Sequence, residues 1–182
     1  SMKDKEQHIL EKVKDGDKSA FQKLFYNYHE SLFRFVAYRM KDTDLADDIT
    51  QETFLRVWKT RESLKPKMSF FSLISRISSN LCNDHFRHLE VRQRHQDSVS
   101  DYVSSKSPDP EMINQGQALK EEIQRIVTEK LPERCRNIFI LSRIDKKSNP
   151  EISEILNLSI RTVENQIYRA LKILKKNLES YL

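Results

Sequence analysis

The chain has 182 residues, a length that suits one ordinary domain or two small ones and excludes a large multi-domain enzyme. Charged residues make up 32% of it and the mean hydropathy is -0.70, so we expect no apolar stretch of the roughly 20 residues that a membrane span needs. Only two glycines and five prolines are present, which argues against phosphate-binding loops, dinucleotide folds and turn-rich β-sandwiches. The composition therefore predicts a mostly helical protein.

The charge balance and the cysteines indicate what kind of partner the chain binds and which cysteine-based sites it lacks. Lysine and arginine total 32 against 27 acidic residues, and the net charge of +5 favours a polyanionic partner, nucleic acid ahead of acidic lipid. Cys82 and Cys135 lie far apart, so neither a disulfide framework nor a paired-cysteine zinc motif is expected. Because no apolar core follows the N-terminal Ser1-Met2, we expect no secretory signal and a cytoplasmic location.

Three amphipathic helices are predicted in the N-terminal half. Across residues 17–38 apolar side chains recur every three or four positions, and Asp17 is a suitable N-cap. After a polar break, a second helix is expected to end near Leu64, because Pro66 cannot continue it. A third periodic segment starts at about Ser69 and passes into a basic tail. The three helices are expected to form one domain.

A polar segment separates this domain from the rest of the chain. Residues 93–110 are rich in serine and aspartate, end in two prolines, and offer too little apolar surface to offset the entropy of ordering them. We therefore assign residues 1–94 to a first domain, 95–118 to a flexible linker and 119–182 to a second domain. Such a linker is compatible with both a compact and a splayed arrangement of the two domains.

The second domain carries the pattern of a helix-turn-helix. After a helix predicted over residues 132–143, Ser148 and Glu151 have the spacing of a capping box at the start of a short helix. Asn157 suits the left-handed position of a tight turn, and Ser159 suits the N-cap of the next helix.

The last predicted helix has an apolar stripe on one side and a polar, basic stripe on the other. Arginine and asparagine at the start of such a helix can make paired hydrogen bonds to guanine and adenine in the major groove. Residues 131–182 hold ten basic and six acidic residues, a local charge of +4 that favours DNA binding over a merely solvated helix face. The predicted DNA-reading side chains are Arg161, Thr162, Asn165 and Arg169.

Four motifs, taken together and in order, resemble one bacterial protein family. They lie at residues 17–28, 46–58, 80–87 and 151–174, and the second includes the run Asp-Asp-Ile-Thr-Gln-Glu-Thr-Phe-Leu-Arg-Val-Trp. With these motifs the chain resembles RNA polymerase sigma factors of the extracytoplasmic-function (ECF) subgroup. The resemblance implies an all-α protein of two small helical domains joined by a flexible linker, the C-terminal one a helix-turn-helix. It also implies a sigma factor that binds core RNA polymerase, directs it to promoter DNA and promotes DNA opening.

The resemblance implies three binding surfaces. The second motif is expected to dock on a coiled coil of the largest polymerase subunit through Asp48, Gln51, Glu52 and Leu55. The following loop and the third helix are expected to hold the minus-ten element through Lys65, Lys67, Phe70, Arg76, Asn80, Asp84 and Arg87. The last helix is expected to read the minus-thirty-five element through Ser159, Arg161, Thr162, Asn165, Arg169 and Lys172.

Several of these residues also have a purely structural interpretation. Trp58 and Phe71 are expected in the core, and core packing is an alternative for Phe70. Two positions depart from the family pattern. Leu73 stands where many members have tryptophan, and Asn157 replaces the glycine usual in the turn, a change that asparagine tolerates at little cost.

Two other functions fit parts of the sequence. Cys82, His85 and His88 are metal-ligand types, but six helical residues turn the first and last about 120° apart, so we expect no metal. The main alternative is a stand-alone helix-turn-helix regulator that binds an operator without polymerase. We expect no catalytic residues, no cofactor and no membrane insertion. Because the chain ends soon after its last predicted helix, the resemblance implies regulation by a separate anti-sigma factor or through the level of expression.

Overall fold

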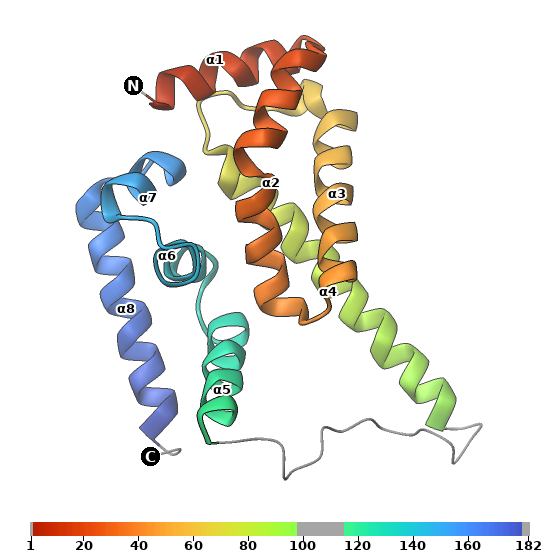
Figure 1. Ribbon diagram of the computed structural model, residues 1–182, viewed down its shortest axis with the longest axis vertical. Coiled ribbons are helices and arrows are strands. Elements are labelled where there is room, and N and C mark those ends of the chain that lie inside the picture. The colour runs from red at the N-terminus through yellow and green to blue at the C-terminus, as the bar shows by residue number, and fades with distance from the viewer. Residues whose placement is uncertain (1, 98–114, 180–182) are drawn as a thin grey trace.

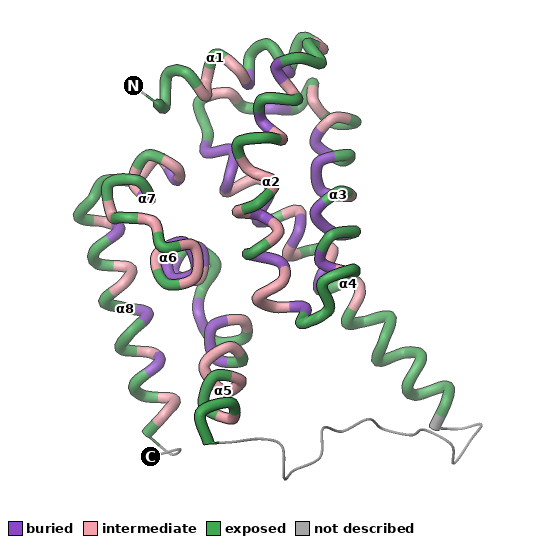
Figure 2. The backbone as a smooth tube through the Cα atoms, viewed as in Figure 1, coloured by how far each residue is buried: buried purple, intermediate pink, exposed green. Residues whose placement is uncertain are grey.

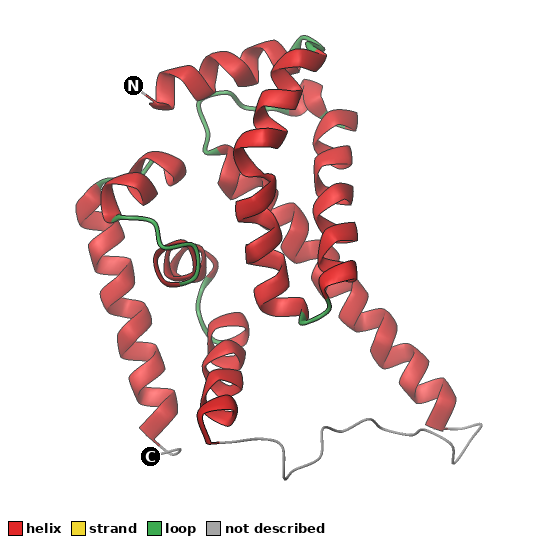
Figure 3. Ribbon diagram, viewed as in Figure 1, coloured by secondary structure: helices red, strands yellow, loops and turns green. Residues whose placement is uncertain are grey.

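The computed structural model describes residues 2–97 and 115–179, and all regular structure in these two ranges is helical. The prediction of an all-α protein is confirmed (Figures 1 and 3). The elements are α1 (Met2–Lys14), α2 (Lys18–Met40), α3 (Thr43–Lys59), η1 (Arg61–Ser63), α4 (Phe70–Asp97), α5 (Gln115–Glu129), α6 (Glu133–Arg143), α7 (Asn149–Leu156) and α8 (Ile160–Leu178).

Helices α2, α3 and α4 pack together as predicted, and each begins at a polar cap. Asp17 accepts a hydrogen bond from the backbone N–H of Ala20 at 3.1 Å, which confirms it as the N-cap of α2. Asp42 caps α3 in the same way. The helices bury their apolar stripes against one another, with Leu24 and Val57 fully buried. Figure 2 shows the buried positions on the inner sides of α2 and α3.

The prediction of three N-terminal helices is wrong by one, because residues 2–14 form the additional helix α1, which lies across the end of α2 (Figure 1). The sequence signal is weak, since only Leu10 and Val13 of this charged segment are fully buried. Glu6 of α1 accepts a hydrogen bond from the Tyr28 hydroxyl of α2 and another from the backbone of Phe70 at the start of α4. Helix α1 is therefore stabilised mainly by tertiary contacts.

The predicted linker, residues 95–118, overlaps two helices. Helix α4 continues to Asp97, and α5 begins at Gln115. The rest of the predicted linker, residues 98–114, lies outside the described residues. Good helix formers such as Arg92 and Arg94 extend α4 beyond its last buried residue, so that its final turns are exposed along their whole length (Figure 2).

The C-terminal half folds as four helices. Helix α6 supplies more of the core of this half than any other described helix, with Cys135, Ile138 and Leu141 buried, and α8 packs along it. Pro132 is the N-cap rather than the first residue of α6, and the helix ends at Arg143 as predicted. None of the helices within residues 2–97 and 115–179 combines the length and apolar character needed to cross a bilayer.

The two halves pack against each other. Helix α7 contacts α1 and α4, and α5 contacts α2. The buried apolar residues of both halves form one connected cluster. Of the two arrangements that the sequence left open, the structure therefore has the compact one.

The half-buried Glu6 carboxyl generates a prediction about pH. Burial raises the pKa of Glu6 above its ordinary value of 4.5, although the Tyr28 and Phe70 hydrogen bonds act in the opposite direction. A raised folded-state pKa contributes stability below the ordinary value, and this contribution is lost as pH rises through the folded-state pKa. The glutamine in the Glu6→Gln variant cannot ionise, so this variant does not lose that contribution. We therefore expect the unfolding free energy of Glu6→Gln, relative to that of wild type, to increase between about pH 4 and pH 7.

Urea unfolding followed by circular dichroism at both pH values measures this difference. Glu11→Gln, on the exposed side of the same helix, is the matched control, and its difference from wild type should change less. An equal pH response of the two variants would contradict the burial argument.

Candidate polymerase and nucleic-acid interfaces

Helix α3 presents the predicted docking residues together on its outer side. Asp48, Gln51 and Leu55 are exposed, and Leu55 retains 45% of its accessible surface. Glu52 is half-buried and pairs with Arg56 at 3.2 Å. Only Asp44 stands in the first turn of the helix, where the helix dipole stabilises negative charge, so the charges of Asp48 and Glu52 lie beyond its reach. The result is an acidic and amide-bearing face with one exposed leucine.

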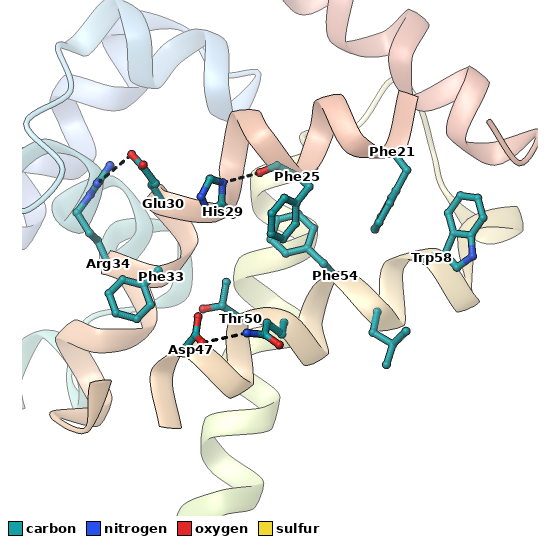
Figure 4. Close-up of a pocket in the computed structure, with 12 residues that line it drawn as sticks. Phe21, Phe25, His29, Glu30, Phe33, Arg34, Asp47, Thr50, Phe54 and Trp58 are labelled. Carbon is teal, nitrogen blue, oxygen red and sulfur yellow. Dashed lines mark hydrogen bonds and ion pairs between the residues drawn. The ribbon is translucent and has the colours of Figure 1, made fainter. Parts of the chain in front are cut away.

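A groove of about 660 Å³ lies beside this face, between α2 and α3. Figure 4 shows aromatic side chains from both helices pointing into it. Among the polar residues that line the groove, the Gln51 amide donates a hydrogen bond to the Asp47 carboxylate at 2.9 Å. The aromatic lining residues are Phe21, Phe25, Phe33, Phe54 and Trp58.

The groove was not predicted from the sequence. The periodic spacing of residues 17–38 predicted an apolar stripe on this helix, but Phe21, Phe25 and Phe33 are only half-buried. Trp58, expected in the core, is half-buried, and the Arg61 guanidinium lies 4.4 Å from the centre of its ring. The one available signal was an excess of aromatic residues on α2 beyond what a single buried stripe can hold.

The predicted strand-binding residues of α4 share one exposed stripe. Arg76, Asn80, Asp84 and Arg87 are all exposed, and Asp84 pairs with Arg87 at 2.7 Å. The stripe continues into a basic tail whose Arg92 and Arg94 are also exposed. On another side of the helix, the Arg39 guanidinium lies 5.2 Å from the centre of the Phe86 ring. This geometry allows one nucleic-acid strand to lie along the helix.

The loop before α4 exposes two of its three predicted contact residues and buries the third. Lys65 and Lys67 are exposed. Phe70, expected as a loop contact, is instead the first residue of α4 and only 1% exposed, with its ring edge-on to Tyr28 at a centroid distance of 5.3 Å. Its side chain is directed into the core because an apolar ring at this position fills the space between α2 and α4. Met68, which the sequence analysis passed over, is 63% exposed on the loop.

Phe71 and Leu73 follow their structural interpretations. Phe71 is 1% exposed, and Leu73 is half-buried against the core. Leu73, which stands where many family members have tryptophan, therefore still packs as an apolar residue against the core.

The helix-turn-helix forms as the caps predict. Ser148 and Glu151 complete a reciprocal capping box at the start of α7, with distances of 3.1 and 3.3 Å. Asn157 adopts the left-handed conformation at φ 56°, and Ser159 accepts a hydrogen bond from the Thr162 N–H at 3.1 Å. The turn and both caps are confirmed.

Helix α8 buries Val163, Ala170 and Leu174 and turns its polar side outward. Thr162 is half-buried, and its hydroxyl lies 2.8 Å from that of Ser159. The remaining predicted DNA-reading residues are all exposed: Ser159, Arg161, Asn165, Arg169 and Lys172.

The cysteines and histidines do not assemble into a metal site in the part of the chain that the structure describes. No group of three or more potential ligands comes together there. Cys82 is 2% exposed on the inner side of α4, whereas His88 is exposed. Both cysteines are free, and burial raises the pKa of each thiol.

Two family profiles match the chain, one in each half. The profile described as Sigma-70 region 2 matches residues 24–92, which include α3 and the exposed stripe of α4. The profile described as Sigma-70, region 4 matches residues 122–174, which include the helix-turn-helix.

Similar proteins cover nearly the whole chain. The ECF RNA polymerase sigma factor SigW of Bacillus subtilis is 28% identical over 177 residues, which are 93% of this chain and 94% of SigW. The ECF RNA polymerase sigma-E factor of Escherichia coli is 27% identical over 179 residues, 91% of this chain and 90% of its own.

Two solved structures share the fold. CnrH in complex with the cytosolic domain of CnrY has a TM-score of 0.53 at 22% identity, over 96% of this chain and 97% of its own. The sigma factor RpoE in complex with the anti-sigma factor NepR from Bartonella quintana has a TM-score of 0.51 at 19% identity, over 87% and 96%.

The capping box generates a prediction about the stability of the helix-turn-helix. Ser148→Ala removes the side chain that satisfies the Glu151 N–H, and we expect a loss of about 1 kcal/mol in unfolding free energy. Urea unfolding measures it. Glu154→Ala, on the exposed side of the same helix, should change stability by less than about 0.5 kcal/mol. Equal losses in the two variants would show that the cap contributes nothing.

Proposed function

Because the chain belongs to the ECF sigma factors, which are transcription initiation factors rather than enzymes in themselves, we propose a specific binding role for each of its three exposed surfaces. Helix α3 docks on core RNA polymerase, the loop and stripe of α4 hold the minus-ten element, and α8 reads the minus-thirty-five element. The observation that carries the proposal is the placement of the acidic face and the two basic faces on separate helices, each with its polar residues exposed.

The docking surface consists of the α3 face and the aromatic groove beside it. Asp48, Gln51 and Glu52 suit basic and amide groups of a partner, while Leu55 and the groove suit an apolar side chain from a helix of that partner. A coiled coil of the polymerase offers both kinds of group on one surface. The aromatic lining supplies the apolar area on which tight binding depends.

The strand-binding surface combines phosphate contacts with a few base contacts. Residues 65–94 hold six basic and two acidic residues, which suits the backbone of an unpaired strand. Lys65, Lys67, Arg76 and Arg87 supply charge, and Asn80 supplies a donor and an acceptor. Asp84 orients Arg87 through their ion pair. Because Phe70 is buried, the exposed Met68 takes the role of apolar loop contact.

The minus-thirty-five surface lies at the N-terminal half of α8. Arg161, Asn165 and Arg169 reach base edges, and Lys172 contacts a phosphate. Ser159 and Thr162 act mainly through the cap that positions the start of the helix.

A protein anti-sigma factor is the regulatory partner in this proposal. It is supported by the structurally similar RpoE, which was solved in complex with the anti-sigma factor NepR. A stand-alone regulator requires no polymerase-binding surface, and the Sigma-70 region 2 match to residues 24–92 argues against that alternative.

Polymerase docking is tested with Leu55→Asp. A charge in place of an exposed apolar side chain should weaken binding to core polymerase at least about tenfold, because the apolar contact is lost and a carboxylate is desolvated. A binding titration with core enzyme and run-off transcription on promoter fragments measure the loss. Lys59→Ala, exposed at the end of the same helix, is the control. Unchanged binding by Leu55→Asp would place the docking surface elsewhere.

The roles of α4 and α8 are separated by a comparison of Asn80→Ala and Arg87→Ala with Arg161→Ala. The α4 variants should reduce permanganate reactivity of minus-ten thymines at saturating holoenzyme, because they act on the opened strand. Arg161→Ala should relax discrimination among upstream sequences by about 1–3 kcal/mol and leave opening intact at saturation. If the α4 variants opened promoters as wild type does, the assignment of that helix would be wrong.

A further inference from the structure

The C-terminal helices bond to the backbone and to Ser69 of the loop that the proposed function assigns to the minus-ten element. The Asn157 amide donates a hydrogen bond to the Lys67 carbonyl at 3.2 Å, and the Ser69 hydroxyl donates one to the Ile155 carbonyl at 2.7 Å. Arg76 pairs with Glu133 of α6 at 3.3 Å. Lys67 and Arg76 therefore line a cavity that they share with the helix-turn-helix turn.

This arrangement cannot hold both promoter elements at once. Elements centred at minus ten and minus thirty-five lie about 25 base pairs apart, which is about 85 Å along B-form DNA. In the structure, the loop assigned to the minus-ten element is joined by a 3.2 Å hydrogen bond to the turn before α8, the helix assigned to the minus-thirty-five element. The two halves must separate before the chain can bind a promoter.

A buried carboxylate joins the two halves. Asp145 lies between α6 and α7, and its side chain is only 3% exposed. Its Oδ2 accepts a hydrogen bond from the Ser31 hydroxyl at 2.9 Å, and its Oδ1 pairs with the Arg34 Nε at 2.5 Å. Both partners belong to α2, in the other half of the chain. A buried carboxylate requires such partners, and it regains water when the halves separate.

Elsewhere in the interface, some buried polar atoms have no hydrogen-bond partner among the described residues. The Asn137 amide donates to the Ser75 hydroxyl at 3.2 Å, but the side-chain oxygens of Asn137 and Asn157 are buried with no hydrogen-bond partner among the described residues. Such atoms gain hydrogen bonds to water on separation, so they favour opening. The interface is thus held by a few specific contacts and is suited to reversible opening.

We propose that Asp145, Ser31 and Arg34 form a latch that holds the chain in a closed, autoinhibited form. The closed form holds the loop backbone at Lys67 against the turn before α8 and pairs Arg76 with Glu133, and so blocks minus-ten binding until the latch opens. Arg34 also lines the groove beside α3, where it approaches Glu30 at 3.8 Å. A polymerase helix that occupies this groove therefore competes with Asp145 for Arg34 and releases the latch. The inhibitory role rests on the proposed function, whereas the latch itself does not.

The latch is tested by the distance between spin labels on the full chain. Lys59→Cys and Lys176→Cys introduce exposed thiols in the two halves, while the native cysteines are buried. The labelled protein should show one dominant distance, and Asp145→Ala should raise the open fraction about tenfold. Glu154→Ala, which removes the same charge from an exposed site in the same half, should not.

Ser31→Ala and the isosteric Asp145→Asn provide further variants in case Asp145→Ala unfolds, which circular dichroism detects. If Ser31 acts through Asp145, the double variant Ser31→Ala, Asp145→Ala should open no further than Asp145→Ala alone. A wild-type distance distribution in every Asp145 variant would overturn the latch.

Inhibition is tested with a single-stranded oligonucleotide of the minus-ten non-template sequence, without polymerase. Asp145→Ala should bind it about tenfold more tightly than Glu154→Ala, which controls for the lost negative charge. Equal affinities together with an opened distance distribution would refute inhibition while leaving the latch. If neither variant binds the strand, the proposed role of α4 fails, and the distance measurement still decides the latch.

Discussion

The first turn of α4 is the junction on which the rest of the structure depends. Phe70 enters the core, and the carboxyl of Glu6 on α1 accepts a hydrogen bond from the Phe70 backbone. The Ser69 hydroxyl accepts from the Ser72 N–H and donates to the Ile155 carbonyl of α7. One helix start thus joins α1, the core of the N-terminal half and the helix-turn-helix. Unpaired backbone N–H groups at a helix start are costly to bury. Ser69 and Glu6 both accept hydrogen bonds from such groups at the start of α4.

Apolar burial and polar contacts stabilise different parts of this sigma factor. Apolar burial stabilises each half, as in the stripe of α3 that contains Ile49 and Val57. Contacts between the halves include several polar ones, and the unpartnered Asn137 oxygen costs about 1–3 kcal/mol in the closed form. Interfaces of this kind open more readily than a domain core, which suits the proposed separation of the two halves.

Local sequence signals predicted much of the fold, and they failed where tertiary packing decided the outcome. The caps at Asp17, Ser148 and Ser159 and the turn at Asn157 depend on side chains bonding to nearby backbone, so their spacing was sufficient. Helix α1 was missed because its apolar stripe is too narrow to signal a helix by itself. Phe70 was misplaced because a periodic pattern does not tell whether a ring at a helix start points inward or toward a ligand.

The sequence by itself determined the helical class, the order of the two halves, and the exposed faces of α3, α4 and α8. These properties follow from residue spacing on one helix, which obeys a fixed period of 3.6. Only the tertiary structure decided that aromatic residues of α2 and α3 leave a groove between them, and that Arg34 and Ser31 meet Asp145 more than 100 positions away in the sequence. Such contacts depend on how separate helices pack against each other. The spacing of residues within one helix does not show which residues of another helix will lie beside it.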